Sequence, residues 1–450
     1  MKFKQICVLG LGYIGLPTAS TFATHGVKVI GVDVNPQVVA TLQNGGLHIH
    51  EPGLRTLVQA ALKSGNLVIS EAPQEADAFV IAVPTPFKVE ESTLKAEGSQ
   101  TAQPSTFNLQ PPTDFPKADL SYVISAAEAI VPWLRRGNLV VLESTSPPAT
   151  TTGLVSEILE RSGLKAGDDF HLAYSPERVL PGQILRELIE NARVVGGVTQ
   201  ASSDAARDLY AIFVRGDIIQ TTATTAEMVK LMENTYRDVN IAIANEFARL
   251  ADRFGIDVWE AIALANRHPR VEILRPGPGV GGHCISVDPW FLVEAAPDLA
   301  PLIHTSRNVN DAQPQFVVRL VRRALGGELK CKKITALGLA YKPDVDDLRE
   351  SPAVDVVRLL MADGATVTAY EPFKLDANLP GIQLAPSLDS ALQGSDLLLL
   401  LVAHTPLREL TPEVVAAQTN ARLVVDTVNL WDAPLWERAG FRVIRLGVGN

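Results

Sequence analysis

Cysteine is scarce in this sequence. Three cysteines occur among 450 residues, Cys7, Cys284 and Cys331. An odd number with wide spacings fits neither a disulfide framework nor a zinc site. We therefore expect a protein of a reducing compartment, the cytoplasm, without a metal site. Cys7 lies in an apolar run and Cys331 lies among lysines, so both are expected to be structural or incidental.

An excess of positive charge and long apolar runs are also lacking. The formal net charge is −10, which provides no basic surface for nucleic acid or an anionic membrane. No apolar run reaches the roughly 20 residues that cross a bilayer. The first apolar run is broken by glycines and leads into a nucleotide motif, unlike a signal peptide. We expect neither a nucleic-acid partner nor a membrane partner.

A nucleotide-binding pattern begins the chain. The apolar run 5–9 is typical of a buried parallel strand. The sequence Gly10-Leu11-Gly12-Tyr13-Ile14-Gly15 follows, then a predicted helix over 16–25 and a predicted strand over 27–32. This order of strand, G-x-G-x-x-G and helix predicts a dinucleotide site at the N-terminus of the helix.

Each glycine of the motif has a distinct purpose. Gly10 permits the tight turn, Gly12 lets the backbone reach a pyrophosphate, and Gly15 lets the helix pack on the strand. Asp33 closes the second strand, where its carboxylate would accept hydrogen bonds from ribose hydroxyls. No arginine follows at once, so the pattern favours NAD over NADP.

Polar residues follow three further predicted strands, 78–83, 139–142 and 170–174. The carboxyl ends of strands in an open α/β sheet are where ligands bind. Thr85 and Thr145 could therefore face cofactor or substrate, and Glu177 is a candidate acid/base. Turn and capping chemistry explains the same residues equally well. The polar stretch Lys88 to Lys117 is expected to be a surface excursion, either a lid or an inert insertion.

One long helix, or two helices end to end, is predicted over 223–254, which contains no proline or glycine and has helical apolar spacing. Lys230 and Asn234 lie four residues apart on one face of it. A second helical stretch covers 258–265. This central segment is expected to bridge two lobes and to offer a subunit contact.

A glycine-rich loop follows the helical segment. Four glycines lie within 277–282, Cys284 follows, and Asp288 comes four residues later. Glycines clear side chains from a loop, so that another molecule can approach the backbone and the thiol. A nucleophilic cysteine is one interpretation, and a buried filler cysteine is the other.

The last third of the chain repeats the order of the first: strand 333–339, loop, helix 353–361 and strand 366–370, ending at Glu371. It lacks the glycine motif. The chain is therefore predicted to be α/β, with two doubly wound Rossmann-like domains joined by a helical domain with a long central helix. The predicted domain ranges are 1–205, which binds NAD, 206–315, which carries the cysteine loop and a subunit contact, and 316–450, where a second nucleotide could bind.

The motifs occur in one order along nearly the whole chain. They are Gly10-x-Gly12-x-x-Gly15, Val83-Pro84-Thr85-Pro86, Ser144-Thr145, Ser175-Pro176-Glu177, Lys230 with Asn234, Gly281-Gly282-His283-Cys284 with Asp288, and Lys342 through Arg349-Glu350-Ser351. This set resembles the UDP-glucose/GDP-mannose dehydrogenase family. The resemblance implies that the 206–315 domain forms a dimer contact and that the 316–450 domain binds a UDP-sugar. The C6 alcohol of that sugar is oxidised to a carboxylate with two NAD⁺.

The resemblance implies roles for the site residues. Cys284 carries a thiohemiacetal and then a thioester, while Lys230 and Asn234 stabilise the oxyanion at C6. Two further residues, Asp288 and Thr145, position water and protons, and Glu177 serves thioester hydrolysis as acid/base. The implied cofactor residues are Gly10, Gly12, Tyr13, Ile14, Gly15, Asp33, Thr85, Thr145 and Arg349. The implied substrate residues are Glu177, Arg178, Val179, Lys230, Asn234, Arg270, Gly281, Tyr341 and Lys342. Arg270 would serve a neighbouring subunit, which implies a homodimer or a higher homo-oligomer.

The sequence around the thiol also indicates a branch of the family. Asn266 to Arg270 and Val287-Asp288-Pro289-Trp290 are most similar to the branch that oxidises UDP-N-acetyl-D-mannosamine for bacterial surface polysaccharides. Pro181 and Val287 stand where the UDP-glucose branch has an acid and a lysine. UDP-N-acetylglucosamine and UDP-glucose remain alternative substrates. A two-electron β-hydroxyacid dehydrogenase and a catalytically silent nucleotide-sugar sensor are alternatives of other kinds.

Overall fold

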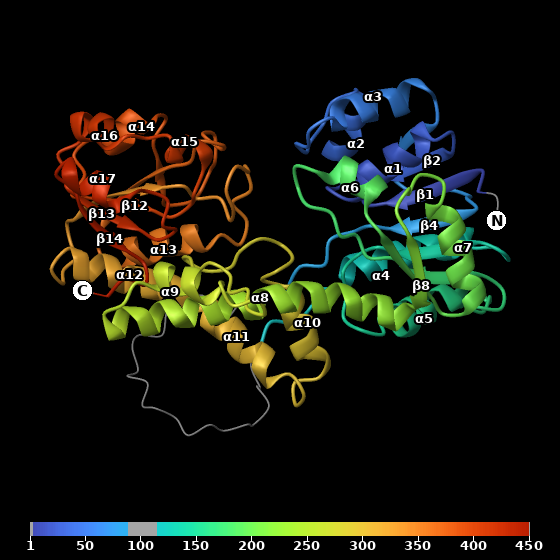
Figure 1. The fold of residues 1–450 in the computed structure, drawn as a ribbon. Coiled ribbons are helices and arrows are strands. Elements are labelled where there is room, and N and C mark those ends of the chain that lie inside the picture. The colour runs from blue at the N-terminus through green and yellow to red at the C-terminus, as the bar shows by residue number, and fades with distance from the viewer. Residues whose placement is uncertain (1–2, 89–114, 450) are drawn as a thin grey trace. The chain divides into compact units, whose positions relative to one another are not determined.

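The structure, a computed structural model, describes residues 3–88 and 115–449. The chain divides into two compact units (Figure 1). The first unit is Met1–Glu233 with Phe291–Leu299, and the second unit is Asn234–Trp290 with Ala300–Asn450. Most of the expected surface excursion, residues 89–114, lies outside the described residues. The three predicted domain ranges stay a prediction.

A sheet of eight strands, counted over the described residues, organises the first unit. Its strand order is β3-β2-β1-β4-β5-β6-β7-β8, and all neighbours are parallel except β6 and β7. The strands are β1 Gln5–Leu9, β2 Lys28–Val32, β3 Leu67–Ser70, β4 Ala78–Ile81, β5 Leu139–Leu142, β6 His171–Tyr174, β7 Arg193–Gly197 and β8 Ile218–Thr222. The α-helices are α1 Gly15–Thr24, α2 Pro36–Gln43, α3 Leu54–Lys63, α4 Ser121–Ile130, α5 Ser156–Leu159, α6 Ile184–Glu190 and α7 Gln200–Tyr210. Two short 3₁₀ helices, η1 Val131–Trp133 and η3 Glu160–Ser162, and one π-helix, η2 Thr151–Val155, accompany them.

Both faces of this sheet are buried, as expected of a parallel sheet with helices on each side. Successive side chains of a strand point to opposite faces. Along β1, Ile6 and Val8 accordingly belong to one apolar core and Cys7 and Leu9 to the other. Burial raises the pKa of the Cys7 thiol to about 12, so Cys7 is a core residue. This outcome agrees with its predicted structural role.

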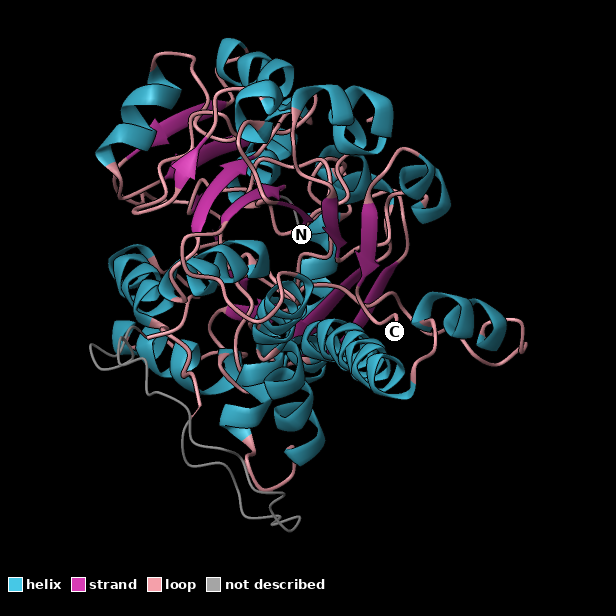
Figure 2. Cartoon of the chain, turned by 90° about the vertical axis from the view of Figure 1, so that its left-hand side faces the viewer, coloured by secondary structure: helices cyan, strands magenta, loops and turns pink. Residues whose placement is uncertain are grey.

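The second unit contains a parallel sheet of six strands within the described residues, ordered β11-β10-β9-β12-β13-β14. The strands are β9 Lys333–Leu337, β10 Thr366–Tyr370, β11 Gln383–Leu384, β12 Leu397–Leu400, β13 Leu423–Asp426 and β14 Arg442–Arg445. Its helices are α9 Val258–Ala265, α11 Pro301–Asp311, α12 Gln313–Ala324, α13 Pro352–Ala362, α14 Leu388–Leu392, α15 Thr405–Arg408, α16 Pro412–Gln418 and α17 Ala433–Arg438. Helices lie beside the strands of both sheets (Figure 2).

Two helices have residues in both units, α8 Ala223–Phe254 and α10 Asp288–Ala295. The bounds of α8 are those predicted from the absence of proline and glycine. Two doubly wound sheets and a long central helix confirm the predicted fold class. Three strands of the first sheet, β3, β7 and β8, were not among the predicted elements.

Candidate active site

The glycine turn after β1 has the geometry that a dinucleotide requires. Gly10 has φ +91°, and a Cβ there would lie 2.5 Å from the carbonyl oxygen of Ala82. A Cβ on Gly15 would lie 1.8 Å from the carbonyl oxygen of Gly10. A Cβ on Gly12 would meet nothing within 4 Å. Gly10 and Gly15 therefore serve the packing of the chain, while Gly12 leaves open space beside the start of α1, where Tyr13 and Ile14 are half-buried.

Asp33 is fixed beside this turn, at the end of β2. Its Oδ2 atom accepts the backbone N–H of Leu11 at 3.0 Å, and its Oδ1 atom accepts the N–H of Asn35 at 2.9 Å. A carboxylate has about four acceptor positions, so lone pairs remain for ribose hydroxyls. The open Gly12 and the fixed Asp33 together fit NAD, whose pyrophosphate would lie at the helix N-terminus.

The loops after β4 and β5 are tied together. The Ser144 hydroxyl donates to the carbonyl oxygen of Val83 at 2.7 Å. Thr85 follows Val83 by two residues, and Thr145 follows Ser144 directly; both threonines are half-buried. The predicted grouping of polar residues at the carboxyl edge of the sheet is therefore present for these two loops.

A buried glutamate links the β5 loop to α8. Glu227 is fully buried and accepts hydrogen bonds from the N–H groups of Ala149 and Thr151, at 2.6 and 2.8 Å. Burial raises its pKa. Lys230 lies one helical turn later and is 8% exposed. Sequence reasoning missed Glu227, because its hydrogen-bond partners lie 76 and 78 positions away in the chain and no local pattern indicates them.

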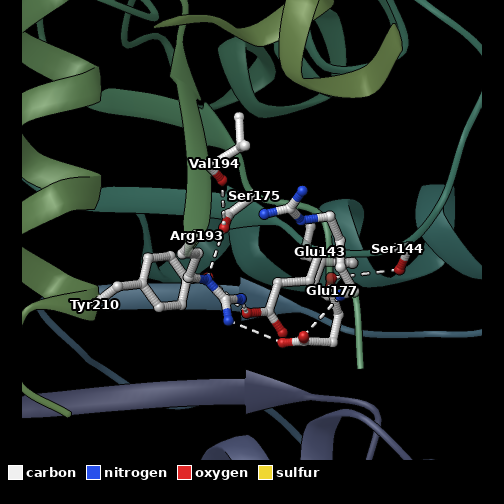
Figure 3. Close-up of polar contacts among 9 residues, drawn as sticks. Glu143, Ser144, Ser175, Glu177, Arg193, Val194 and Tyr210 are labelled. Atoms are coloured by element: carbon white, nitrogen blue, oxygen red, sulfur yellow. Dashed lines mark hydrogen bonds and ion pairs between the residues drawn. The ribbon is translucent and has the colours of Figure 1, made fainter. Parts of the chain in front are cut away.

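Glu177 lies just beyond β6 with its carboxylate held at both oxygens (Figure 3). Its Oε2 atom accepts from Nη1 of Arg193 at 2.8 Å, and its Oε1 atom accepts the backbone N–H of Arg178 at 2.7 Å. The Arg178 guanidinium pairs with Glu233 at 2.6 Å, and Val179 is half-buried. Arg193 was not predicted; an arginine within the apolar run of a strand was the signal for it.

Cys284 is exposed and precedes α10. Its carbonyl oxygen accepts the N–H groups of Val287 at 3.1 Å and Asp288 at 2.8 Å. These bonds turn the chain directly into the helix. Asp288 is the first residue of α10 and is 1% exposed. The thiol residue and the carboxylate residue are thus held by one turn.

Asn234 and Asp288 are in direct contact. The Nδ2 atom of Asn234, on α8, donates to the Oδ2 atom of Asp288. Two of the predicted catalytic residues, 54 positions apart in the chain, are therefore brought together within the second unit.

The glycines before the thiol serve a different purpose from the one predicted. We expected them to clear space for another molecule, but three of them pack against the chain itself. A Cβ on Gly279 would lie 2.7 Å from Pro352, one on Gly281 would lie 2.2 Å from the carbonyl oxygen of Glu350, and one on Gly282 would lie 2.8 Å from the Tyr341 ring. Only Gly277 of the four meets nothing within 4 Å.

The loop after β9 contains three predicted binding residues, Tyr341 and Lys342 for the UDP-sugar and Arg349 for the cofactor. Lys342 has its Nζ atom 5.8 Å from the centroid of the Tyr341 ring. Arg349 donates to Asp347 at 2.9 and 2.7 Å, so its guanidinium is engaged within its own loop. Burial lowers the pKa of His283, and the charge of Arg349 adds to this effect. Arg270 is exposed in the segment after α9.

Glu371 has the same place in the second sheet as Asp33 in the first. Its Oε2 atom accepts the N–H groups of Leu339 and Ala340, at 2.7 and 2.9 Å, and its Oε1 atom accepts the N–H of Phe373 at 3.0 Å. Glu371 is fully buried, however, and His404 also contacts Oε2 at 3.1 Å. The predicted repeat of strand, loop, helix, strand and acid is confirmed, and its acid has a structural role.

The predicted residues fall into two groups, each described within its own unit. The first unit carries the glycine turn, Asp33, Thr85, Thr145, Glu177, Arg178, Val179 and Lys230; the second carries Asn234, Arg270, Gly281, Cys284, Asp288, Tyr341, Lys342 and Arg349. Over residues 3–88 and 115–449, no three His, Cys, Asp or Glu side chains gather so as to hold a metal ion. In the same residues no helix combines the length and the apolar character that a membrane span needs.

Known families and relatives match almost the whole chain. Three models of the UDP-glucose/GDP-mannose dehydrogenase family match: the NAD binding domain at residues 4–214, the central domain at 224–312 and the UDP binding domain at 335–433. A UDP-N-acetyl-D-mannosamine dehydrogenase of Methanococcus maripaludis is 45% identical over 99% of this chain and 97% of its own.

Two further relatives are similar over almost their full length. An NDP-N-acetyl-D-galactosaminuronic acid dehydrogenase of Ralstonia nicotianae is 47% identical, covering 96% of this chain and 97% of its own. The solved structure of a UDP-D-ManNAc dehydrogenase from Pyrococcus horikoshii has a TM-score of 0.86 at 38% identity, with 99% of each chain covered.

Proposed function

Because the chain belongs to the UDP-glucose/GDP-mannose dehydrogenase family, we propose that it oxidises UDP-N-acetyl-D-mannosamine at C6 to UDP-N-acetyl-D-mannosaminuronate. Family membership makes it an NAD-dependent nucleotide-sugar dehydrogenase. NAD⁺, when bound at the glycine turn of the first unit, supplies the hydride acceptor. The observation that carries the proposal is the hydrogen bond between Asn234 and Asp288. Asp288 follows the exposed Cys284 by four residues.

The chemistry divides among the residues of the chain. The Cys284 thiolate adds to the C6 aldehyde and gives a thiohemiacetal, whose oxidation leaves a thioester on the same sulfur. Lys230 and Asn234 donate hydrogen bonds to the oxygen on C6 as negative charge develops there. Asp288 and Thr145 position water and protons, and Glu177 acts as acid/base when the thioester is hydrolysed.

The remaining predicted contacts place the two ligands. We assign Thr85, Thr145 and Arg349, with the glycine turn, to the cofactor. Arg178, Val179, Gly281, Tyr341 and Lys342 belong to the UDP-sugar site. The Lys342 ammonium suits a phosphate as a point charge, and the aromatic ring of Tyr341 offers a stacking face for a base.

An N-acetylhexosamine is the favoured sugar. Two relatives at 45 and 47% identity are named for an N-acetylated mannosamine or galactosaminuronic acid. Val287 is 7% exposed, and a lysine in its place would put a charge in a buried position. Because of the second relative, oxidation of UDP-N-acetyl-D-galactosamine is the alternative function to test.

Steady-state formation of NADH with four UDP-sugars tests the substrate. UDP-N-acetylmannosamine should give the highest kcat/KM, above UDP-N-acetylgalactosamine, UDP-N-acetylglucosamine and UDP-glucose. Fast turnover of UDP-glucose without turnover of any N-acetyl sugar would overturn the proposal. Tight binding of UDP-sugar and NAD⁺ without NADH formation would instead indicate a sensor.

We also propose that the chain acts in the cytoplasm as a homodimer or higher oligomer, in the synthesis of a surface polysaccharide. One side of α8 supports the oligomer, because it exposes Tyr236, Ile243, Phe247, Leu250 and Phe254 at near-helical spacing. Multi-angle light scattering of the purified protein should give at least twice the chain mass of 48.4 kDa. A Phe254→Asp variant should shift the protein towards the monomer.

A further inference from the structure

Arg193 is the centre of a buried polar cluster in the first unit (Figure 3). Its guanidinium donates to Glu177 at 2.8 Å, to Glu143 at 2.5 Å and to the Ser175 hydroxyl at 2.9 Å. The Arg193 side chain is 5% exposed, and that of Glu143 is fully buried. Such a pair costs desolvation energy that its own attraction barely recovers, so a cluster of this kind calls for a role beyond stability.

The surroundings fix the guanidinium in one orientation. The Ser175 hydroxyl donates to the carbonyl oxygen of Val194 at 3.1 Å, so a lone pair of its oxygen faces Arg193. The Tyr210 ring stacks on the guanidinium, with 3.8 Å from Cζ to the ring centroid, and its hydroxyl donates to Glu143 at 2.6 Å. The cluster therefore joins the ends of β5, β6 and α7 to the first residue of β7.

The two carboxylates on Arg193 are not equivalent. Glu143 lies at the fully buried end of the cluster, and its Oε2 atom has no hydrogen-bond partner among the described residues. Burial raises the pKa of Glu143 to about 7; the charge of Arg193 opposes this rise and that of Glu177 adds to it. Glu177 lies at the other end with its side chain 8% exposed, so its carboxylate is the one that reaches the edge of the cluster.

We propose that Arg193, held by Glu143, Ser175 and Tyr210, is the positioning residue that holds the Glu177 carboxylate in one orientation for its proposed acid/base role in hydrolysis of the Cys284 thioester. This inference rests on the proposed function and deepens it. In the step, the water oxygen bonds to the thioester carbon and the carbon–sulfur bond breaks. The sulfur leaves as the Cys284 thiolate, one water proton passes to Glu177, and the acid product loses the other to solvent.

The rival explanation is that Arg193 only neutralises Glu143. Removing the arginine alone would leave two carboxylates without their cation and could unfold the first unit. The informative variant is therefore the double one, Glu143→Gln with Arg193→Met, in which no uncompensated Glu143 charge remains. Tyr210→Phe is a milder variant that keeps the ring on the guanidinium and removes one hydroxyl. Arg161→Met is the matched control, because Arg161 pairs with Glu128 on the surface.

The experiment uses UDP-N-acetylmannosamine and NAD⁺ and follows three signals: the first-turnover NADH, the steady-state kcat and KM, and the mass of the acid-quenched protein. For the double variant we expect first-turnover NADH within a few-fold of wild type and KM within a few-fold. We expect kcat to be lowered about 100-fold, with an acyl adduct on Cys284. Tyr210→Phe should lower kcat a few-fold with the same adduct, and Arg161→Met should match the wild type.

Two results would overturn the inference alone. One is a double variant with wild-type kcat and no adduct, which would mean that Arg193 only neutralises the charge of Glu143. The other is an equal loss of first-turnover NADH and kcat, which would indicate a general structural role. A wild type that gives no acid, or a Glu177→Gln variant that gives no adduct, would instead reject the proposed function itself.

Discussion

The side-chain amide of Asn234 donates a hydrogen bond to the carboxylate of Asp288 and so joins α8 to the first residue of α10. Because the carbonyl oxygen of Cys284 accepts the N–H of Asp288, the same contact ties the thiol loop to the long helix. Lys230 lies one helical turn before Asn234 on α8. Asn234, Asp288 and the turn that carries the Cys284 thiol are thus held together within the second unit.

Replacing Asn234 with alanine should lower kcat by about 100- to 1000-fold, the usual cost of removing an oxyanion donor. The KM for the UDP-sugar should change less, because the lost bond is strongest in the transition state. Steady-state NADH formation measures both. Asn240→Ala is the matched control, since the Asn240 amide donates to the carbonyl oxygen of Tyr236 on the same helix. Equal kinetics for the two variants would refute a catalytic role for Asn234.

Replacing Cys284 with serine should lower uronate formation by roughly three orders of magnitude or more, because a hydroxyl is a far weaker nucleophile than a thiolate. The thermal midpoint and the NAD⁺ affinity should stay near those of wild type, since Cys284 is exposed. Cys331→Ser, at the other exposed cysteine, should leave activity unchanged. Acid production at the wild-type rate by the Cys284 variant would remove the thioester scheme.

Local pattern was sufficient to predict the long helix and several strands of each sheet. The range Ala223–Phe254 follows from an unbroken run of helix-compatible residues, and β1 and β5 follow from short apolar runs. The packing of three loop glycines against the chain itself was not predicted, because glycine permits close approach without specifying the neighbour. Here the neighbours are Pro352, Glu350 and Tyr341.

Buried charged residues were harder to predict from the sequence. Arg193, Glu143 and Glu227 are buried and partnered over 50 to 78 positions in the chain, and no local pattern reports such pairings. The burial of Glu371 could not be predicted for the same reason. Its place after β10 matches that of Asp33 after β2, and only His404, 33 positions away, shows that the second acid is enclosed.

Ala149 has φ +69°, in the left-handed region where an L side chain costs roughly 1–2 kcal/mol. Glycine avoids this strain and loses part of the gain to unfolded-chain entropy. Ala149→Gly should therefore stabilise the protein by up to about 1 kcal/mol, measured as a higher thermal midpoint. The matched control is Ala60→Gly in the exposed interior of α3, which should destabilise by about 1 kcal/mol. A drop in midpoint for both variants would contradict strain at Ala149.

Glu371 should make the second unit sensitive to acid. Burial opposes its ionisation, but hydrogen bonds from His404 and the backbone outweigh burial and hold its pKa below the usual 4.5. A carboxyl with a lowered folded-state pKa stabilises the fold above about pH 4.5 and loses that effect as the pH falls through the folded value.

Glu371→Gln should therefore cost about 2 kcal/mol at pH 7, the worth of charge-assisted hydrogen bonds, and progressively less below pH 4.5. Urea unfolding at pH 7 and pH 3.5 measures the difference from wild type. Glu437→Gln, at an exposed glutamate of α17, should show little effect at either pH. A gap that widens in acid would mean that the Glu371 pKa is raised instead.

The most direct test of the account is the amount of NADH formed per UDP-N-acetylmannosamine consumed, with the sugar product identified by mass spectrometry. Oxidation of an alcohol to a carboxylate through a Cys284 thioester predicts two NADH for each UDP-N-acetylmannosaminuronate. One NADH per sugar, with an aldehyde or ketone as the product, would contradict it.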